Sequence, residues 1–317
     1  MSEKFVIGSR ESDLALCQAN DIRASLENLF PNTQFEIKII RTTGDKLLDT
    51  ALSKIGDKGL FTREIEAELL KGSVDMAVHS LKDLQTAQPD GLTIGAVCKR
   101  ETPNDVLISK SGATIDDLPQ GAVVATGSLR RRSQLLHYRP DLRVEDIRGN
   151  VPTRLRKFGE SELDGIILAF AGLNRLGLGS HISQVLPFKI MLPAVGQGAI
   201  AVEIRYDDKR TSEVVRKLDD RTTHSCAKAE RAFLRRLEGG CQVPVGALAK
   251  LEGRTLVLEG MVGSLDGTVL FREKIDGEPD NAEGIGTRLA DKLIEMGARE
   301  LLANTREEVA ASSKVTI

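Results

Sequence analysis

The chain of 317 residues contains no tryptophan, and aromatic residues make up only 3% of it. Proteins that bind single-stranded nucleic acid place aromatic stacking platforms between basic residues, so this scarcity disfavours that class. The four cysteines, Cys17, Cys98, Cys226 and Cys241, show no paired spacing, and the four histidines are equally scattered. We therefore expect neither a disulfide framework nor a metal site.

Long apolar runs and a strong charge of one sign are also absent. No apolar run approaches the roughly 20 residues of a membrane span, and the opening MSEKFVIGSR lacks the apolar core of a signal peptide. A cytoplasmic protein is therefore expected. With 44 basic against 46 acidic residues the net charge is −2, so the chain cannot bind polyanions through bulk charge, and any anion site must be local.

Hydrophobic periodicity predicts an α/β architecture. A strand at KFVIGSR precedes a helix from about Asp13 to Phe30, which Ser12 caps and Pro31 ends. Further strands are expected at FEIKIIRT, VDMAVHS and LTIGAVC, with a helix at REIEAELLKG. The pattern restarts after the polar KRETPND, with strands at VLIS, AVVATGS, RVEDIRG and DGIILAF and a helix at LRRRSQLLHY. Such alternation favours largely parallel sheets covered by helices.

A chain of this length favours two or three domains. The strand IAVEI could run back into the first α/β unit, which would make two crossing connections and a cleft between lobes. From about Asp219 the pattern changes to a helix, antiparallel strands at LVLEGMVGS and VLFREKID, and a helix near 282–296. The expected domains are domain 1 (1–98 plus 198–218), domain 2 (103–192, sharing an active-site cleft with domain 1) and domain 3 (219–317, α+β).

Polar and basic residues follow several predicted strands, where ligands bind in open α/β sheets. These residues are Ser9, Arg10, Ser80, Lys82, Asp83, Thr126, Ser128, Arg130, Arg131 and Arg148. From Arg130 to Lys157, eight Arg and one Lys against three acids give a local charge of +6. Hydroxyls and free N–H groups at a helix start, beside Arg forks, form an anion trap. Small polycarboxylates fit better than nucleotides, because no Walker-type loop or glycine fingerprint is present.

Individual residues allow functional and purely structural interpretations. Neighbouring cations would keep Asp83 ionised, able to accept N–H bonds or stabilise a developing cation, although an isolated Lys-Asp pair is more often a loop salt bridge. His79 is more often structural than catalytic. The glycine-bearing loop 42–59 could be a lid that closes Lys54 and Lys58 over an anion, or a loop without function. In LEGGCQVPVG, flexible backbone and a fixed turn would hold Cys241 at a loop tip.

A series of motifs resembles the hydroxymethylbilane synthase, or porphobilinogen deaminase, family along essentially the whole chain. The motifs are SRESDLAL, GDKGLFTREIE, AVHSLKD, SLRRRSQLLHYRPDL, IRGNVPTRL, AGLNRLGL, LPAVGQGA and LEGGCQVPVG. The resemblance implies two periplasmic-binding-protein-like, doubly wound lobes, each with a mixed, mainly parallel sheet, plus a small C-terminal α+β domain. It also implies a transferase of porphyrin and heme biosynthesis. Such an enzyme condenses four porphobilinogen molecules head to tail on a covalent dipyrromethane, releasing ammonia and, by hydrolysis, the linear tetrapyrrole hydroxymethylbilane.

The same resemblance implies roles for single residues. Cys241, in domain 3, would carry one dipyrromethane through a thioether, because a thiolate attacks an electrophilic pyrrole methylene. Asp83 would be the catalytic aspartate. Further cofactor contacts are implied at Ser80, Lys82, Asp83, Thr126, Ser128, Arg130, Arg131, Arg148 and Gln197. Substrate contacts are implied at Arg10, Phe61, Arg148, Arg154 and Arg175.

Some positions depart from the family pattern. Gly127 stands where many members have Ser, Leu84 and Gln85 replace a common Val-Pro, and Asp13 replaces a common Pro. The resemblance implies a monomer with porphobilinogen as substrate and no nucleic-acid or membrane partner, whose product could pass directly to the next enzyme. A two-lobed anion-binding protein is the alternative, although it would give Cys241 no task. A nucleic-acid binder using residues 130–157 ranks last and would show steeply salt-dependent affinity.

Overall fold

The computed structural model describes residues 3–46, 59–237 and 243–314. These residues fall into two compact units. One unit holds the described residues up to 101 together with 198–225, and the other holds 102–197 with the described residues from 226 onward. The chain therefore passes into the second unit after Glu101, returns at Gly198, and leaves again within helix α9 (Arg221–Arg236).

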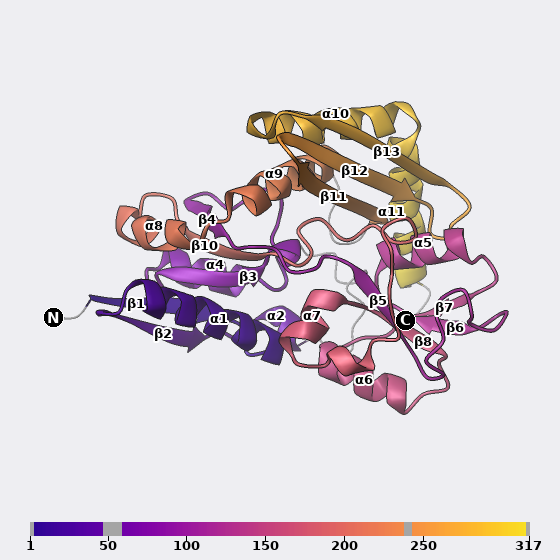
Figure 1. Ribbon diagram of the computed structural model, residues 1–317, viewed down its shortest axis with the longest axis horizontal. Helices are drawn as coiled ribbons and strands as arrows, with labels where there is room; N and C mark the ends of the chain where they lie inside the picture. The colour runs from indigo at the N-terminus through magenta and orange to yellow at the C-terminus, as the bar shows by residue number, and fades with distance from the viewer. Residues whose placement is uncertain (1–2, 47–58, 238–242, 315–317) are drawn as a thin grey trace. The chain divides into compact units, whose positions relative to one another are not determined.

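A five-stranded sheet forms the centre of the first unit, in the order β2-β1-β3-β10-β4. The strands are β1 (Glu3–Ser9), β2 (Thr33–Ile39), β3 (Met76–Ser80), β4 (Leu92–Val97) and β10 (Ile200–Arg205). β1 is parallel to β2 and β3, whereas β10 is antiparallel to β3 and β4. Because β10 is the strand predicted at IAVEI, its pairing confirms that the chain runs back into the first unit (Figure 1).

Helices cover both faces of this sheet. The helices are α1 (Asp13–Leu29), α2 (Thr43–Lys46), α4 (Arg63–Leu70) and α8 (Lys209–Val215), with short 3-10 turns η1 (Leu81–Asp83) and η3 (Arg216–Leu218). As predicted, the Ser12 hydroxyl caps α1, accepting a bond from the Ala15 N–H at 3.4 Å. α1 buries Ile22 and Leu26 in one apolar core, and α4 buries Ile65 in another with Ala77 of β3. Each such aliphatic side chain contributes about 1.5–3 kcal/mol on burial.

The second unit contains a second five-stranded sheet, in the order β7-β6-β8-β5-β9. Its strands are β5 (Asp105–Ser109), β6 (Val123–Ala125), β7 (Arg143–Glu145), β8 (Gly165–Ala169) and β9 (Gln184–Val185), with helices α5 (Leu129–Tyr138), α6 (Val151–Gly159) and α7 (Phe170–Arg175) and the turn η2 (Gly179–His181). β6 is parallel to β7 and β8, and β5 is antiparallel to β8 and β9. Both sheets are thus mixed, with a single reversed strand among mainly parallel ones in the part of the chain described, as predicted.

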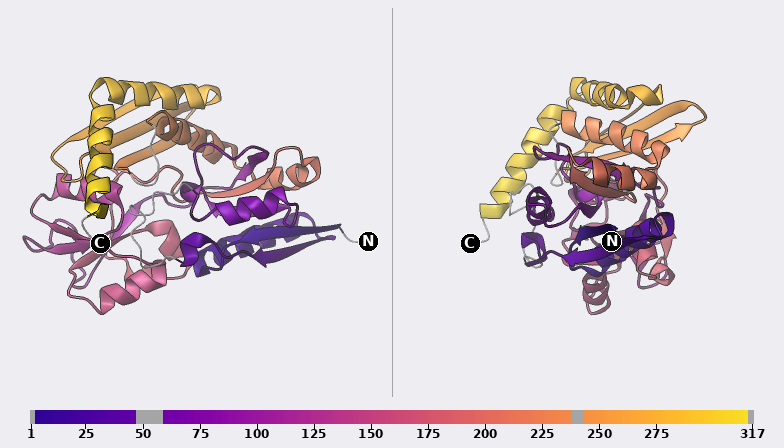
Figure 2. Two further views of the ribbon diagram at one scale, coloured as in Figure 1. Left: turned by 180° about the vertical axis from the view of Figure 1, so that it is seen from behind. Right: turned by 90° about the vertical axis from the view of Figure 1, so that its left-hand side faces the viewer.

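The same unit also holds an antiparallel three-stranded sheet with helices. Its elements are α9, β11 (Val245–Glu252), β12 (Thr255–Gly263), β13 (Leu270–Gly277), the turn η4 (Pro279–Asn281), α10 (Ala282–Glu295) and α11 (Ala298–Lys314). α10 lies across β12 and β13, and α11 turns steeply away from it (Figure 2). Gly260 on β12 permits the close approach of α9, since an added Cβ would lie 2.6 Å from the Phe233 ring. The predicted C-terminal α+β region is therefore confirmed, although our sequence analysis named neither β11 nor α11.

Candidate active site

The carboxyl end of β3 is held at a fixed point by its neighbours within the first unit. The Gln18 side chain of α1 donates to Ser80 Oγ at 2.9 Å, and the Leu81 N–H donates to the Ala199 carbonyl at 3.0 Å. Leu81 itself is buried, whereas Lys82 and Asp83 are half-buried. The turn η1 therefore presents Lys82 and Asp83 from an anchored backbone.

Arg10, directly after β1, is held by an acid that our sequence analysis did not single out. Its Nε lies 3.2 Å from Asp45 Oδ1, and its guanidinium carbon lies 4.2 Å from the centroid of the Phe61 ring. Burial would raise the pKa of Asp45, but hydrogen bonds and charge from Arg10 and a hydroxyl bond from Thr42 hold it below its usual range. Asp45 is thus ionised at neutral pH and, with Phe61, restrains the Arg10 guanidinium.

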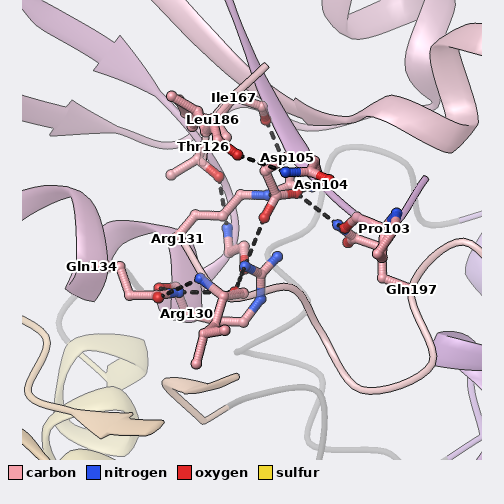
Figure 3. Close-up of polar contacts among 12 residues, drawn as sticks. Pro103, Asn104, Asp105, Thr126, Arg130, Arg131, Gln134, Ile167, Leu186 and Gln197 are labelled. Carbon is pink, nitrogen blue, oxygen red and sulfur yellow. Dashed lines mark hydrogen bonds and ion pairs between the residues drawn. The ribbon is translucent and has the colours of Figure 1, made fainter. Parts of the chain in front are cut away.

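In the second unit, the two arginines at the start of α5 converge on one buried carboxylate, Asp105 (Figure 3). Arg130 Nη1 donates to Asp105 Oδ2 at 2.7 Å and to the Leu192 carbonyl at 2.6 Å. Arg131 donates to Asp105 Oδ1 from Nε at 3.0 Å and from Nη2 at 2.7 Å, and its Nη1 reaches the Ile167 carbonyl. Asp105 is fully buried, and both arginines are at most 5% exposed.

Gln197, at the point where the chain leaves the second unit, joins the same cluster. Its Nε2 donates to Asp105 Oδ1 at 3.0 Å and to the Pro103 carbonyl at 2.7 Å. Gln134 of α5 brackets the backbone of Leu192, which accepts from Gln134 Nε2 and donates to its Oε1. The cluster thus ties α5, the start of β5 and the crossing segment together through charged hydrogen bonds.

The electrostatic balance of this cluster is positive. Burial alone would raise the pKa of Asp105, but the two guanidinium groups hold it well below its usual range. Burial also lowers the pKa of Arg130, against the opposing charge of Asp105. One carboxylate against two guanidinium groups leaves one net positive charge. Among the described residues, Arg130 Nε and Nη2 have no hydrogen-bond partner, so these donors can serve an anion.

The turn before α5 carries Thr126 and Ser128 and packs against Arg148. The Ser128 N–H donates to Thr126 Oγ1 at 3.3 Å. β7 ends at Glu145, short of Arg148, whose Nη2 lies 3.3 Å from Asp146 while its Nε is buried without a partner in the described residues. An added Cβ at Gly127 would lie 3.0 Å from the Arg148 guanidinium carbon. Glycine at position 127 therefore leaves room for this guanidinium.

The remaining predicted residues are distributed over helices or lie outside the described residues. Arg154 of α6 donates from Nε to the Gly149 carbonyl at 2.7 Å, and Arg175 is the last residue of α7. Cys241, Lys54 and Lys58 lie outside the described residues. Within those residues no group of His, Cys, Asp or Glu is arranged to hold a metal ion, and no helix is both long and apolar enough to cross a bilayer.

Comparison with known proteins gives matches along almost the whole chain. Residues 5–213 match the model of the porphobilinogen deaminase dipyromethane cofactor binding domain, and residues 224–295 match the porphobilinogen deaminase C-terminal domain. The chain belongs to the porphobilinogen deaminase family. It is 55% identical to the porphobilinogen deaminase of Pelotomaculum thermopropionicum over 97% of this chain and 99% of that one, and 50% identical to that of Chlorobium phaeobacteroides over the same shares.

Likeness to solved structures is weaker. The BvgS VFT2 domain of Bordetella pertussis shares 16% identity over 68% of this chain and 86% of that one, with a TM-score of 0.42. The aliphatic sulphonate binding protein SsuA of Escherichia coli shares 15% over 75% and 71%, with a TM-score of 0.40. Similarity this weak does not assign a fold class. The fold class is therefore taken from the order of the strands in this chain's own sheets.

Membership of the porphobilinogen deaminase family confirms the activity indicated by the sequence motifs. The enzyme is a transferase of porphyrin biosynthesis that forms hydroxymethylbilane on a dipyrromethane cofactor. The alternatives of an anion-binding protein and a nucleic-acid binder are therefore set aside.

Proposed function

We propose that Asp83 is the catalytic residue for the condensation of porphobilinogen. A carboxylate at this position accepts pyrrole N–H bonds and offsets the positive charge that develops as porphobilinogen loses ammonia. The observation that carries this role is that the backbone of turn η1 is anchored. The Leu81 N–H donates to the Ala199 carbonyl, and Ser80, the preceding residue, accepts a bond from Gln18. A fixed carboxylate stabilises charge better than a mobile one, since it does not have to reorient during the reaction.

The residues of the second unit fit a cofactor that bears carboxylates. The net positive charge of the buried cluster and the unpartnered Nε of Arg148 both favour an anionic ligand. The cofactor-holding residues would be Ser80, Lys82 and Asp83 of the first unit and Thr126, Ser128, Arg130, Arg131 and Arg148 of the second. Gln197 would act through Asp105, to which it donates. When bound, the dipyrromethane supplies the pyrrole position to which the first substrate is joined.

Other parts of the proposal concern the substrate and the organisation of the chain. Arg10, Arg154 and Arg175, with Arg148, would hold the substrate's acetate and propionate groups, and Phe61 would lie against its pyrrole ring. Lys54 and Lys58 would belong to a lid. We also propose the three-domain division given above, a monomeric cytoplasmic enzyme without nucleic-acid or membrane partners, and hand-over of the product to the next enzyme of the pathway.

The covalent anchor is tested by the intact mass of the denatured protein. The unmodified chain is expected to exceed its polypeptide mass by one dipyrromethane, and Cys241→Ser is expected to show the bare mass, since serine is a far weaker nucleophile than a thiolate. Cys98→Ser is the matched control and should keep the excess. Excess mass retained by Cys241→Ser would refute the anchor. An unmodified chain that starts bare and gains no mass on incubation with porphobilinogen would refute it as well.

A further inference from the structure

Three ionisable side chains that the proposed reaction does not use lie together beneath α4 in the first unit. Glu66 comes from α4, His79 from β3 and Glu203 from β10. The His79 and Glu203 side chains are 3% and 0% exposed, with His79 Nε2 3.3 Å from Glu203 Oε2. Glu203 pairs with Ala77 across the two strands, so it shares a sheet face with Ala77 and His79. The same face packs against α4, which carries Glu66.

The polar atoms of this cluster lack the partners that buried groups normally have. Both carboxylate oxygens of Glu203, Nε2 of His79, Oε1 of Glu66 and the Thr62 hydroxyl are buried without a hydrogen bond among the described residues. An unsatisfied buried polar group costs about 1–3 kcal/mol, and more when it is charged. Groups gathered in this way can lower that cost by keeping protons between them, because a shared proton removes net charge.

The charges acting on Glu66 come from each element packed around it. Burial raises the pKa of Glu66, and the charge of Glu203 on β10 raises it further. The nearby Thr62 hydroxyl, the charge of His79 on β3 and that of Arg63 on α4 oppose the rise without cancelling it. Two carboxylates close together in a buried site cannot both be ionised cheaply.

The geometry of the cluster allows hydrogens to be held between its members. His79 Nε2 and Glu203 Oε2 are 3.3 Å apart, and both side chains are buried. A carboxylate left in such a site without a compensating group would be strongly unfavourable.

The cluster is next to the proposed catalytic turn η1 along the strand β3. His79 precedes Ser80, and the segment that enters β10 supplies the Ala199 carbonyl that holds Leu81. We propose that Glu66, His79 and Glu203 form a buried proton-holding site that keeps β3 and β10 paired, with His79 and Glu203 as positioning residues for Asp83. The positioning part rests on the proposed role of Asp83, whereas the proton-holding part does not.

The proton-holding site is tested by stability and infrared measurements on the folded protein. Because the pKa of Glu66 is raised in the folded chain, its contribution to stability is present at acidic pH and is lost as pH rises above the ordinary carboxyl range. Glu66→Gln should flatten this decline in urea unfolding between pH 5 and 9. As pH is lowered, the infrared band of a protonated carboxyl should appear at a higher pH in the unmodified chain than in Glu66→Gln. Glu213→Gln, at an exposed site on α8, is the control and should change neither result.

The positioning role is tested by turnover of Glu203→Gln. We expect kcat to fall about tenfold while KM changes by less than about twofold, with a pH profile altered relative to the unmodified enzyme. A carboxyl band that appears at the same pH in the unmodified chain and in Glu66→Gln would overturn the proton-holding site. Unchanged kcat in a folded Glu203→Gln would overturn the positioning role. Neither spectroscopic nor unfolding measurements depend on Asp83, so failure of its proposed role would show separately, as undiminished turnover in Asp83→Asn.

Discussion

Asp83→Asn is expected to lower kcat by about a hundredfold or more, because removal of one preorganised electrostatic group costs about 10²–10³ in rate. Asparagine has nearly the same shape as aspartate and can still accept a hydrogen bond, but it carries no charge to stabilise a developing cation. The anchors of the turn are Ser80 and Leu81, so the variant should keep its fold. Turnover at saturating porphobilinogen, with circular dichroism and intact mass, measures the effect.

A matched substitution separates this role from a loop salt bridge. Asp90→Asn changes an exposed aspartate of the same unit and should leave kcat unchanged. If Asp83 only paired with Lys82 at the surface, its replacement would alter stability by about 0–1 kcal/mol and leave turnover near normal. Near-normal turnover in Asp83→Asn, with cofactor present, would therefore contradict the assignment.

Asp105→Asn is expected to reduce the free energy of unfolding by about 3–5 kcal/mol, because it leaves the Arg130 and Arg131 guanidinium groups buried without a counter-charge. Urea unfolding measures the loss. The control is Asp141→Asn, which breaks a more exposed ion pair with Arg139 and should cost much less stability than Asp105→Asn. A loss as small as that of the control would mean that the buried Arg130 and Arg131 guanidinium groups do not need the Asp105 charge.

The dependence on pH gives a second test of the same cluster, which remains informative if Asp105→Asn folds poorly. The pKa of Asp105 is depressed in the folded chain, so its stabilising contribution is present above the usual aspartate range and is lost as pH falls below it. The sign is opposite to that expected from Glu66. The unmodified protein should therefore lose stability steeply on acidification, and an Asp105→Asn sample that is still folded should lose less.

Most elements could be predicted because their periodicity is strong. The strand ending at Ser9 and the helix capped by Ser12 lie where alternation and capping signals placed them. β11 was missed because its first five residues, Val245–Ala249, are all buried and rich in Ala and Gly, so they neither alternate nor favour strands by composition. Its pairing with β12 provides the stability that local propensity does not.

The sequence by itself determined the family, the α/β pattern and the set of charged residues after the strands, because motifs and periodicity are local properties of the chain. Only the tertiary structure decided which charges meet. Asp105 lies 25 residues before Arg130, and Gln18 lies 62 residues before Ser80. No spacing rule in the sequence connects such pairs. The same holds for Glu66, His79 and Glu203, which are brought together by a helix packed on two paired strands. Burial then determines how strongly these charges act, because removing water lowers the local dielectric and forces each group to pair or to keep its proton.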